Sequence, residues 1–362
     1  MKKILALILT LTMVFSLCAC GAEENEPEAQ GKKTEAPAEN AEMPAESRMF
    51  TDSVGREVEV PADIRRIIPS GGMAMMFMWP LAGDRIISVD HRLNEMQTKY
   101  LGHSCDNLPE TGNLYRVGEE MNIEEVAKLN ADIIIDFGEA KESIGKDLDE
   151  LQELLGVPCI FISGTLENSA DSYRMLGELL GMEAEAEKIA VYIEELVDTV
   201  HKVFESTEKK DAVILNGSDA LGCVASGTFF DEIWAFMVNN IAVVDEAQMY
   251  TSTGIDFEQL ANWDPEYLFI YGSNDPETIV DADSWQELSA VKNNKYFGVP
   301  KGPYGYVTPP SVNRYLAAIW LSEVVYPGVF PWDAKEMIKE FYDLFYHYEL
   351  SDAEYTEITG LN

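Results

Sequence analysis

Residues 122–135 read NIEEVAKLNADIII, and residues 256–269 read DFEQLANWDPEYLF. The two stretches correspond position by position at a constant offset of 134 residues. Each begins with an Asn or Asp that can cap a helix, and Glu125 or Gln259 follows three residues later to complete a capping box. Each then runs through one helical face into an apolar strand. The chain therefore predicts two halves that repeat one βα plan.

Short β-rich runs alternate with helical patterns along the chain. This alternation is typical of parallel sheets and predicts an α/β protein. The part of the chain after residue 47 exceeds the size at which a single core stops growing, so we expect two Rossmann-like lobes with mainly parallel sheets. The expected strands are 66–69, 85–89, 132–137, 159–163, 212–216, 241–244 and 267–271.

A long helical stretch separates the two halves. Its apolar residues recur at helical spacing, and Gly181 is expected to divide it into two segments. A helix of about 25 residues spans roughly 37 Å, which is long enough to cross from one lobe to the other. We interpret residues 168–207 as a rigid connector between an N-terminal lobe at 48–167 and a C-terminal lobe at 208–362.

The N-terminus has the order of a secretory signal. Lys2 and Lys3 precede an uncharged, largely apolar run at 4–17, which is too short to span a bilayer as a helix. The Leu-Cys-Ala-Cys that ends this region resembles the bacterial lipobox, in which the signal is cut before the cysteine that carries the lipid. We predict a signal peptide at 1–19 and a lipid anchor on Cys20; the alternative is an ordinary secretory signal that contains two cysteines.

Residues 20–47 predict a disordered tether. This segment is rich in Glu, Ala, Pro, Asn and Lys, and Met43 is its one large apolar side chain after the anchor. Such a composition cannot bury enough apolar surface to offset the entropy of ordering. A tether of this kind holds a domain near a membrane, and no later stretch of the sequence is a transmembrane candidate.

The balance of charge limits the partners. The formal net charge is −38, and removal of Lys2 and Lys3 with the signal takes it to −40. Nucleic acid and anionic lipid surfaces are therefore disfavoured, and a basic receptor surface or a cationic ligand is favoured. Cys105, Cys159 and Cys223 are odd in number and lack Cys-x-x-Cys spacing, so they indicate neither a disulfide framework nor a zinc site and allow at most one bridge.

An ordered set of motifs resembles the helix-linked substrate-binding proteins of the iron-siderophore, haem and cobalamin uptake group, the class III or TroA-like binding proteins. The resemblance covers about residues 48–355 and includes both copies of the repeat. Its other motifs are TDSVGREVEVP at 51–61, RRIIPS at 65–70, PSVNR at 310–314, WL at 320–321 and FYDLFY at 341–346.

The resemblance implies a lipoprotein on the extracytoplasmic side of the membrane, at the cell surface or facing the periplasm. It implies a monomer without a cofactor that carries a metal chelate, namely a ferric siderophore, haem or cobalamin, to an ABC permease and its ATPase. More distant members bind oxyanions such as molybdate or tungstate, which is the alternative cargo. In the family an acidic knob on each lobe docks to permease arginines, and by motif position these knobs are Glu124 and Glu258.

Candidate ligand-binding residues lie in the loops after the expected strands, where open α/β sheets place their ligands. The Ser-Gly-Gly turn at 70–72 offers backbone N–H groups to an anion or is simply a turn that requires glycine. Tyrosines suit a large, partly apolar chelate, and the two arginines suit ligand carboxylates or act as structural ion-pair partners. The candidates are Ser70, Gly71, Gly72, Met73, Tyr115, Arg116, Glu139, Tyr250, Tyr271, Tyr304, Tyr306 and Arg314.

A metal site and an enzyme are both disfavoured. His91 lies beside Asp90 in a cleft loop and is the one histidine considered as a direct metal ligand, against a structural or solvated role. The sequence has no Gly-x-Ser-x-Gly elbow, no phosphate-binding Gly-x-x-x-x-Gly-Lys loop and no His-Glu-x-x-His. A solute-binding protein without catalytic activity is therefore expected, and a ligand sensor for a membrane kinase is the other alternative.

Overall fold

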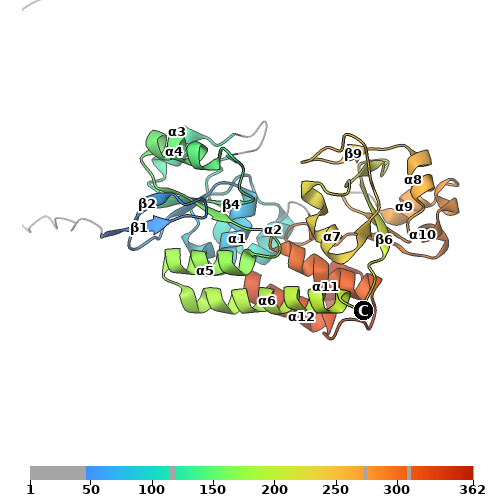
Figure 1. Cartoon of the computed structure of the whole chain (residues 1–362). Helices are drawn as coiled ribbons and strands as arrows, with labels where there is room; N and C mark the ends of the chain where they lie inside the picture. The colour runs from blue at the N-terminus through green and yellow to red at the C-terminus, as the bar shows by residue number, and fades with distance from the viewer. Residues whose placement is uncertain (1–45, 115–119, 273–274, 308–310, 362) are drawn as a thin grey trace, which may run out of the picture. The chain divides into compact units, whose positions relative to one another are not determined.

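The computed structural model describes residues 46–114, 120–272, 275–307 and 311–361. Figure 1 shows strands and helices alternating along the chain. The residues in these described ranges group into one compact unit. Within the described ranges, every helix is too short or too polar to cross a lipid bilayer.

The N-terminal half contains a three-stranded parallel sheet in the order β3-β4-β5. Ile133 and Ile135 face the large core of the protein, whereas Ile134 faces a smaller cluster with α3 and α4. Because both faces are buried, the strands are apolar at nearly every position. The elements are β3 (Ile67–Pro69), α1 (Gly72–Ala82), α2 (Glu95–Leu101), α3 (Ile123–Lys128), β4 (Ile133–Gly138), α4 (Ile144–Leu155) and β5 (Cys159–Ser163).

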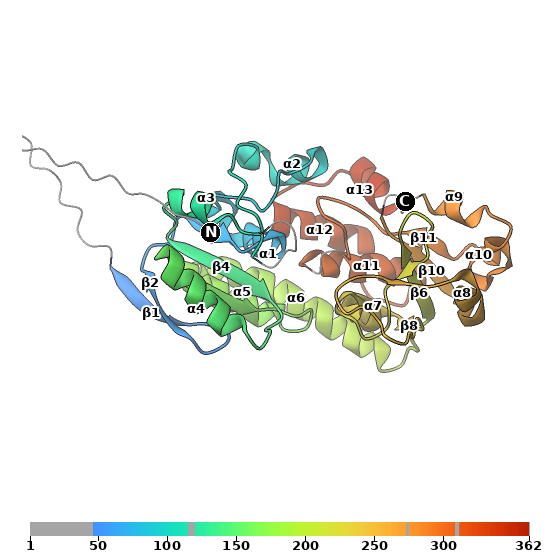
Figure 2. The same ribbon diagram turned by 90° about the horizontal axis from the view of Figure 1, so that it is seen from above.

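The C-terminal half repeats this arrangement with β11, β10 and β6 as neighbouring parallel strands, which lie side by side in Figure 2. Ile214 and Phe269 face the large core, and Leu215 and Leu268 face a separate cluster. Short strands β7, β8 and β9 extend the sheet beyond β6. The elements are β6 (Asp211–Asn216), β7 (Gly222–Cys223), α7 (Glu232–Met237), β8 (Asn239–Asn240), β9 (Thr253–Gly254), α8 (Phe257–Trp263), β10 (Tyr267–Ile270), α9 (Pro276–Val280), α10 (Ser289–Lys292) and β11 (Tyr296–Gly298).

The internal repeat builds the same substructure in both halves. The Asn122 side chain accepts the backbone N–H of Glu125 at 3.2 Å, and Asp256 accepts that of Gln259 at 2.8 Å. The capped helices, α3 and α8, lead into β4 and β10, each of which lies between two parallel neighbours. The predicted βα plan is confirmed, although Glu125 binds Lys128 at 2.6 Å where a full capping box was expected.

The prediction of two strands is wrong. The run at 85–89 begins in a 3₁₀ turn and makes only isolated bridges, one of them between Ile86 and Ile67. In place of a strand at 241–244 the chain forms β8 two residues earlier, at Asn239–Asn240. The Asn240 side chain there binds Asp231 and the N–H of Ala242, which turns the following run away from the sheet.

The stretch interpreted as the connector forms two helices, as expected from Gly181. α5 (Ser169–Leu180) ends at Gly181, whose left-handed φ of 67° favours glycine, and α6 (Glu183–Phe204) follows. With 22 residues, α6 is about 33 Å long at 1.5 Å per residue. The two helices pack closely because Gly177 has no side chain: a Cβ there would lie 2.5 Å from that of Ala186.

Helices from the end of the chain pack on the connector and on the N-terminal half. The Tyr192 hydroxyl of α6 donates to the carbonyl of Met337 at 3.0 Å, and a ring nitrogen of His347 lies 3.1 Å from the carbonyl oxygen of Pro80 in α1. One apolar cluster therefore contains residues from Phe50 to Tyr355 of the sequence and packs against one face of each sheet. These helices are α11 (Asn313–Val325), α12 (Ala334–Tyr346) and α13 (Asp352–Thr359).

The three cysteines of the described part are buried and free, which answers the question of a disulfide left open by the sequence. Burial raises the pKa of Cys159 to about 12 and that of Cys223 to about 11. Their thiols therefore stay protonated and unreactive at neutral pH.

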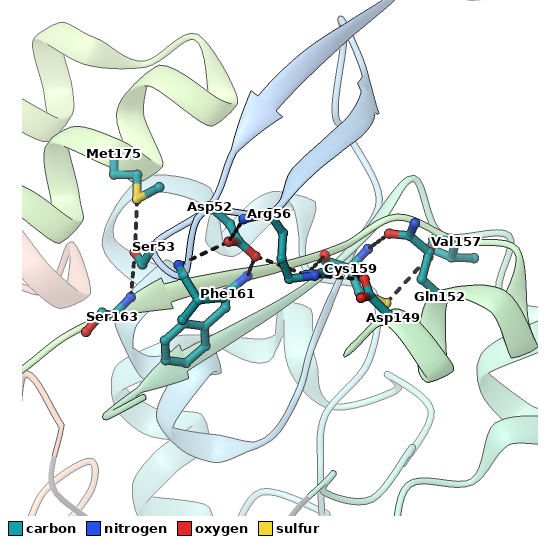
Figure 3. Close-up of polar contacts among 11 residues, drawn as sticks. Asp52, Ser53, Arg56, Asp149, Gln152, Val157, Cys159, Phe161, Ser163 and Met175 are labelled. Carbon is teal, nitrogen blue, oxygen red and sulfur yellow. Dashed lines mark hydrogen bonds and ion pairs between the residues drawn. The ribbon is translucent and has the colours of Figure 1, made fainter. Parts of the chain in front are cut away.

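A hairpin of β1 (Ser47–Thr51) and β2 (Glu57–Pro61) is fastened to β5 by a buried ion pair (Figure 3). Asp52 contacts Arg56 at 3.0 Å and also accepts N–H groups of its own turn and of Phe161. Arg56 in turn donates to the carbonyl of Cys159 at 2.9 Å and pairs with Asp149. The family motif at 51–61 thus has a structural role.

We expect Asp52→Ala to lower the free energy of unfolding by about 3–5 kcal/mol, because it removes the buried carboxylate partner of Arg56, leaving only the exposed Asp149, and removes the acceptor of the Phe161 N–H. Urea denaturation of the mature chain measures this change. The control is Asp63→Ala, which removes an exposed ion pair with Arg65 and should leave the midpoint nearly unchanged. Equal midpoints for the two variants would contradict the assigned role of Asp52.

Candidate functional site

A cavity of about 510 Å³ lies between α2 of the N-terminal half and the loops after β10 and β11, and we call it the cleft cavity. Met96 and Gln97 form part of its α2 wall, and Tyr271 and Tyr304 line the opposite wall. Its volume falls in the range of small-molecule sites. Two of the predicted tyrosines are thus brought together, along with residues of α2 that were not predicted.

The loop after β11 is held rigidly. The carbonyl of Gly302 accepts the Tyr342 hydroxyl at 2.6 Å, and the carbonyl of Tyr304 accepts the side-chain N–H of Asn313 at 3.1 Å. Tyr304 is 8% exposed, and burial raises its pKa well above the ordinary value. Its ring is therefore a fixed, neutral, largely apolar surface beside the cleft cavity.

A polar cluster lies at the end of the C-terminal sheet. The Asn216 side-chain amide donates to the hydroxyl of Tyr271 at 2.6 Å and to that of Ser252 at 2.5 Å. The two hydroxyl oxygens are 3.2 Å apart, and burial raises the pKa of Tyr271. This network fixes the orientation of the Tyr271 ring where the ring lines the cleft cavity.

The turn at 70–72 is already engaged by protein carboxylates. The Ser70 hydroxyl donates to Asp136, and the N–H of Gly72 donates to Asp90 at 3.1 Å. Gly71 packs against the Asn113 side chain, so closely that a Cβ on Gly71 would lie 2.2 Å from an amide nitrogen. The N–H of Gly72, which was expected to be open to an anion, therefore binds the Asp90 carboxylate at the start of α1. Glycine is required at position 71 because a side chain there would collide with Asn113.

Two predicted cleft residues belong to the interior. Tyr306 has no exposed surface and lies beside Tyr342. Arg314 is 5% exposed and pairs with Glu232, whose other oxygen accepts the N–H of Leu166 at 2.7 Å. Burial lowers the pKa of Arg314. Both side chains therefore have little surface left for a ligand, and Arg314 makes an ion pair of the kind considered as its alternative role.

The other predicted residues are scattered or lie outside the described residues. Tyr250 is 74% exposed, and its ring centroid is 5.6 Å from that of Phe229. Met73 is half-buried, and Glu139 is exposed. The candidates outside the described residues are Tyr115, Arg116 and Cys20.

His91 pairs with Asp90, its Nδ1 lying 2.9 Å from a carboxylate oxygen. The described residues contain no group of three His, Cys, Asp or Glu side chains arranged to hold a metal ion. This part of the chain therefore offers no built metal site of protein ligands.

The capping box of α2 is visible in the sequence. Asn94 and Gln97 form it at the start of the helix, and Met96 between them is 43% exposed. A single exposed apolar side chain is common on protein surfaces. The sequence therefore predicts the helix but not its place beside the cleft cavity.

The two predicted docking residues occupy equivalent places. Glu124 is the second residue of α3 and Glu258 is the second residue of α8, and both are exposed. A carboxylate in the first turn of a helix is favoured by the helix dipole. Each half therefore presents one acidic side chain at the same point of its repeat.

Comparisons with known proteins agree with this architecture. A family model described as a periplasmic binding protein matches residues 73–302. The molybdate-binding protein MolA of Haemophilus influenzae is 22% identical over 332 residues, which cover 83% of this chain and 91% of that protein.

Two solved structures are similar in fold. An ABC transporter solute binding protein from Sulfurospirillum deleyianum has a TM-score of 0.78 at 23% identity and covers 87% of this chain and 99% of its own. A periplasmic solute binding protein from Veillonella parvula has a TM-score of 0.73 at 24% identity and covers 87% of this chain and 97% of its own. The predicted fold class is confirmed.

Proposed function

Because the chain belongs to the periplasmic binding protein family, we propose that it captures a metal chelate outside the cytoplasm and delivers it to the permease of an ABC importer. Members of this family bind solutes for transport and are not enzymes. The proposed cargo is a ferric siderophore, haem or a cobalamin. The cleft cavity of about 510 Å³ with its fixed tyrosines is the observation that carries this choice.

A chelate suits the cleft cavity better than a compact oxyanion does. Tyr271 and Tyr304 offer ring surface, and Val299 and Val307 add aliphatic surface. An oxyanion requires several converging donors, and Lys301 is the one cationic side chain among the described residues that line this cavity. Molybdate or tungstate is retained as the second candidate because the similar MolA protein is described as molybdate-binding.

The cargo is tested by calorimetric titration of the mature chain carrying Cys20→Ser, which lacks the lipid. The panel comprises ferric hydroxamate and catecholate siderophores, haemin, cyanocobalamin and molybdate. We expect dissociation constants of about 1 μM or below for one chelate class, as is typical of a preformed cavity that buries most of its ligand. Tight binding of molybdate alone would replace the chelate by the oxyanion as cargo.

We further propose that Glu124 and Glu258 dock to basic residues of the permease. Their equivalent, exposed positions on the two halves support this role, since two separated charges fix the orientation of docking. A sensor for a membrane kinase would bind the same cargo without supporting uptake, so transport itself distinguishes the two roles.

The double variant Glu124→Ala/Glu258→Ala should reduce uptake of labelled cargo by about ten-fold or more while leaving cargo affinity unchanged, because only the docking charges are lost. The matched control is Glu153→Ala/Glu277→Ala, which removes two exposed charges outside the repeat positions. Loss of cargo affinity in the first variant, or equal uptake by both variants, would rule out the docking role.

We also propose that Cys20 carries the lipid that anchors the protein. Cys20→Ser should release the protein from the membrane fraction and abolish incorporation of labelled fatty acid, because a protein without acyl chains has little membrane affinity. Cys18→Ser is the control and should remain membrane-bound. Release by both variants, or by neither, would exclude Cys20 as the lipidated residue.

A further inference from the structure

A second cavity of about 780 Å³ adjoins the cleft cavity, and we call it the side chamber. It lies between α2, the loops after β10 and β11, and the last turn of α13. The two cavities have lining residues in common, so they lie side by side. The shared residues are Met96, Gly272, Val299, Pro300 and Lys301.

The lining of the side chamber is mixed: five charged side chains lie on it, and its apolar residues form one part of the wall. Ile270 and Val299 come from the strand ends, and Pro300 follows them in the loop after β11. Pro276 and Ile358 line it from α9 and α13. Apolar surface is stabilised by removal from water, so this part of the wall favours contact with a hydrocarbon or aryl group.

The wall between α2 and α13 is preformed. Lys99 of α2 lies 2.7 Å from Glu354 of α13 and holds the pKa of that carboxyl at about 2. The Tyr100 ring packs edge-on against Tyr348 at 4.9 Å and Tyr342 at 5.4 Å between centroids. The side chamber therefore exists before any ligand arrives, which spares the ligand the cost of ordering it.

The charges of the side chamber disfavour a multiply charged anion. Glu95, Asp275 and Glu357 line it and are exposed. Lys99 is engaged by Glu354, which leaves Lys301 to balance three carboxylates. An oxyanion would meet net repulsion here, whereas an uncharged arm would not.

We propose that the side chamber receives an apolar arm of the cargo, with Met96 and Tyr100 as specificity-determining side chains. This inference rests on the proposed function and narrows its substrate class to chelates that carry a hydrocarbon or aryl extension. The chelate body occupies the cleft cavity, and the arm passes Met96 into the side chamber. Met96 suits this position because its flexible thioether adapts to the shape of what passes.

The test fills the side chamber by mutation. Glu357→Trp places a large ring at an exposed lining position of α13. Thr356→Trp is the matched control, one residue earlier on the same helix, exposed and outside the lining. Glu357→Gln separates loss of charge from gain of bulk. All are made in the mature chain with Cys20→Ser, and circular dichroism checks folding.

The first readout does not depend on the cargo. The probe is N-phenyl-1-naphthylamine, a neutral apolar dye that fluoresces on leaving water. We expect the unmutated chain, Thr356→Trp and Glu357→Gln to bind it, and Glu357→Trp to bind it about ten-fold more weakly or not at all. Absence of dye binding to the unmutated chain, or equal binding by Glu357→Trp, would overturn the side chamber as an apolar site.

The second readout links the side chamber to the cargo. The chelate that binds in the titration panel should displace the dye and lose about ten-fold in affinity in Glu357→Trp but not in Thr356→Trp. A chelate that binds both variants equally and leaves the dye in place would refute the proposal that an apolar arm enters the side chamber. The proposed function would remain intact. If no panel member binds the unmutated chain, the proposed cargo is rejected. The dye result still shows whether the side chamber binds apolar groups.

Discussion

The apolar core shared by the two halves is the constraint on which the rest of the structure depends. One face of each parallel sheet has its own small cluster, but the other face of both sheets packs into a single cluster that includes α5, α6, α11 and α12. Moving one sheet relative to the other would expose this cluster to water, at a cost proportional to the apolar area uncovered. The distance between the carboxyl ends of the strands in one sheet and those in the other is therefore fixed by the packing of this shared cluster.

Polar contacts reinforce this constraint at the point where the halves meet. Leu166, in the loop after β5, donates its N–H to Glu232 of α7 and accepts the hydroxyl of Tyr315 of α11 at 2.8 Å. Glu232 also pairs with Arg314, which is buried and therefore needs that partner. These contacts explain why an arginine that the motif placed among ligand residues is used for structure.

The parts of the fold that the sequence predicted are those with a local physical signature. The helix caps at Asn122 and Asp256, the apolar strands after them and the glycine at 181 each act within a few residues. The predictions that were wrong depend on contacts between segments distant in the sequence. The apolar run at 241–244 bonds to β6 through the N–H of Ile241, and the pairing stops there because the Asn240 side chain binds the N–H of Ala242. Tyr306 lies in a loop without periodicity yet is buried beside Tyr342 of α12. Neither the bond to β6 nor the burial of Tyr306 follows from neighbouring residues.

The same reasoning explains why only part of the site was found. Loops after parallel strands are predictable positions, so Tyr271 and Tyr304 were identified, but the opposite wall comes from α2, which lies after no sheet strand. Its position depends on the ion pair of Lys99 with Glu354 and on the edge-on packing of Tyr100 against Tyr348, contacts with residues some 250 positions away. A cavity built from such distant segments keeps its shape only while the shared core holds them together, so core packing determines the shape of the cleft cavity as much as the lining residues do.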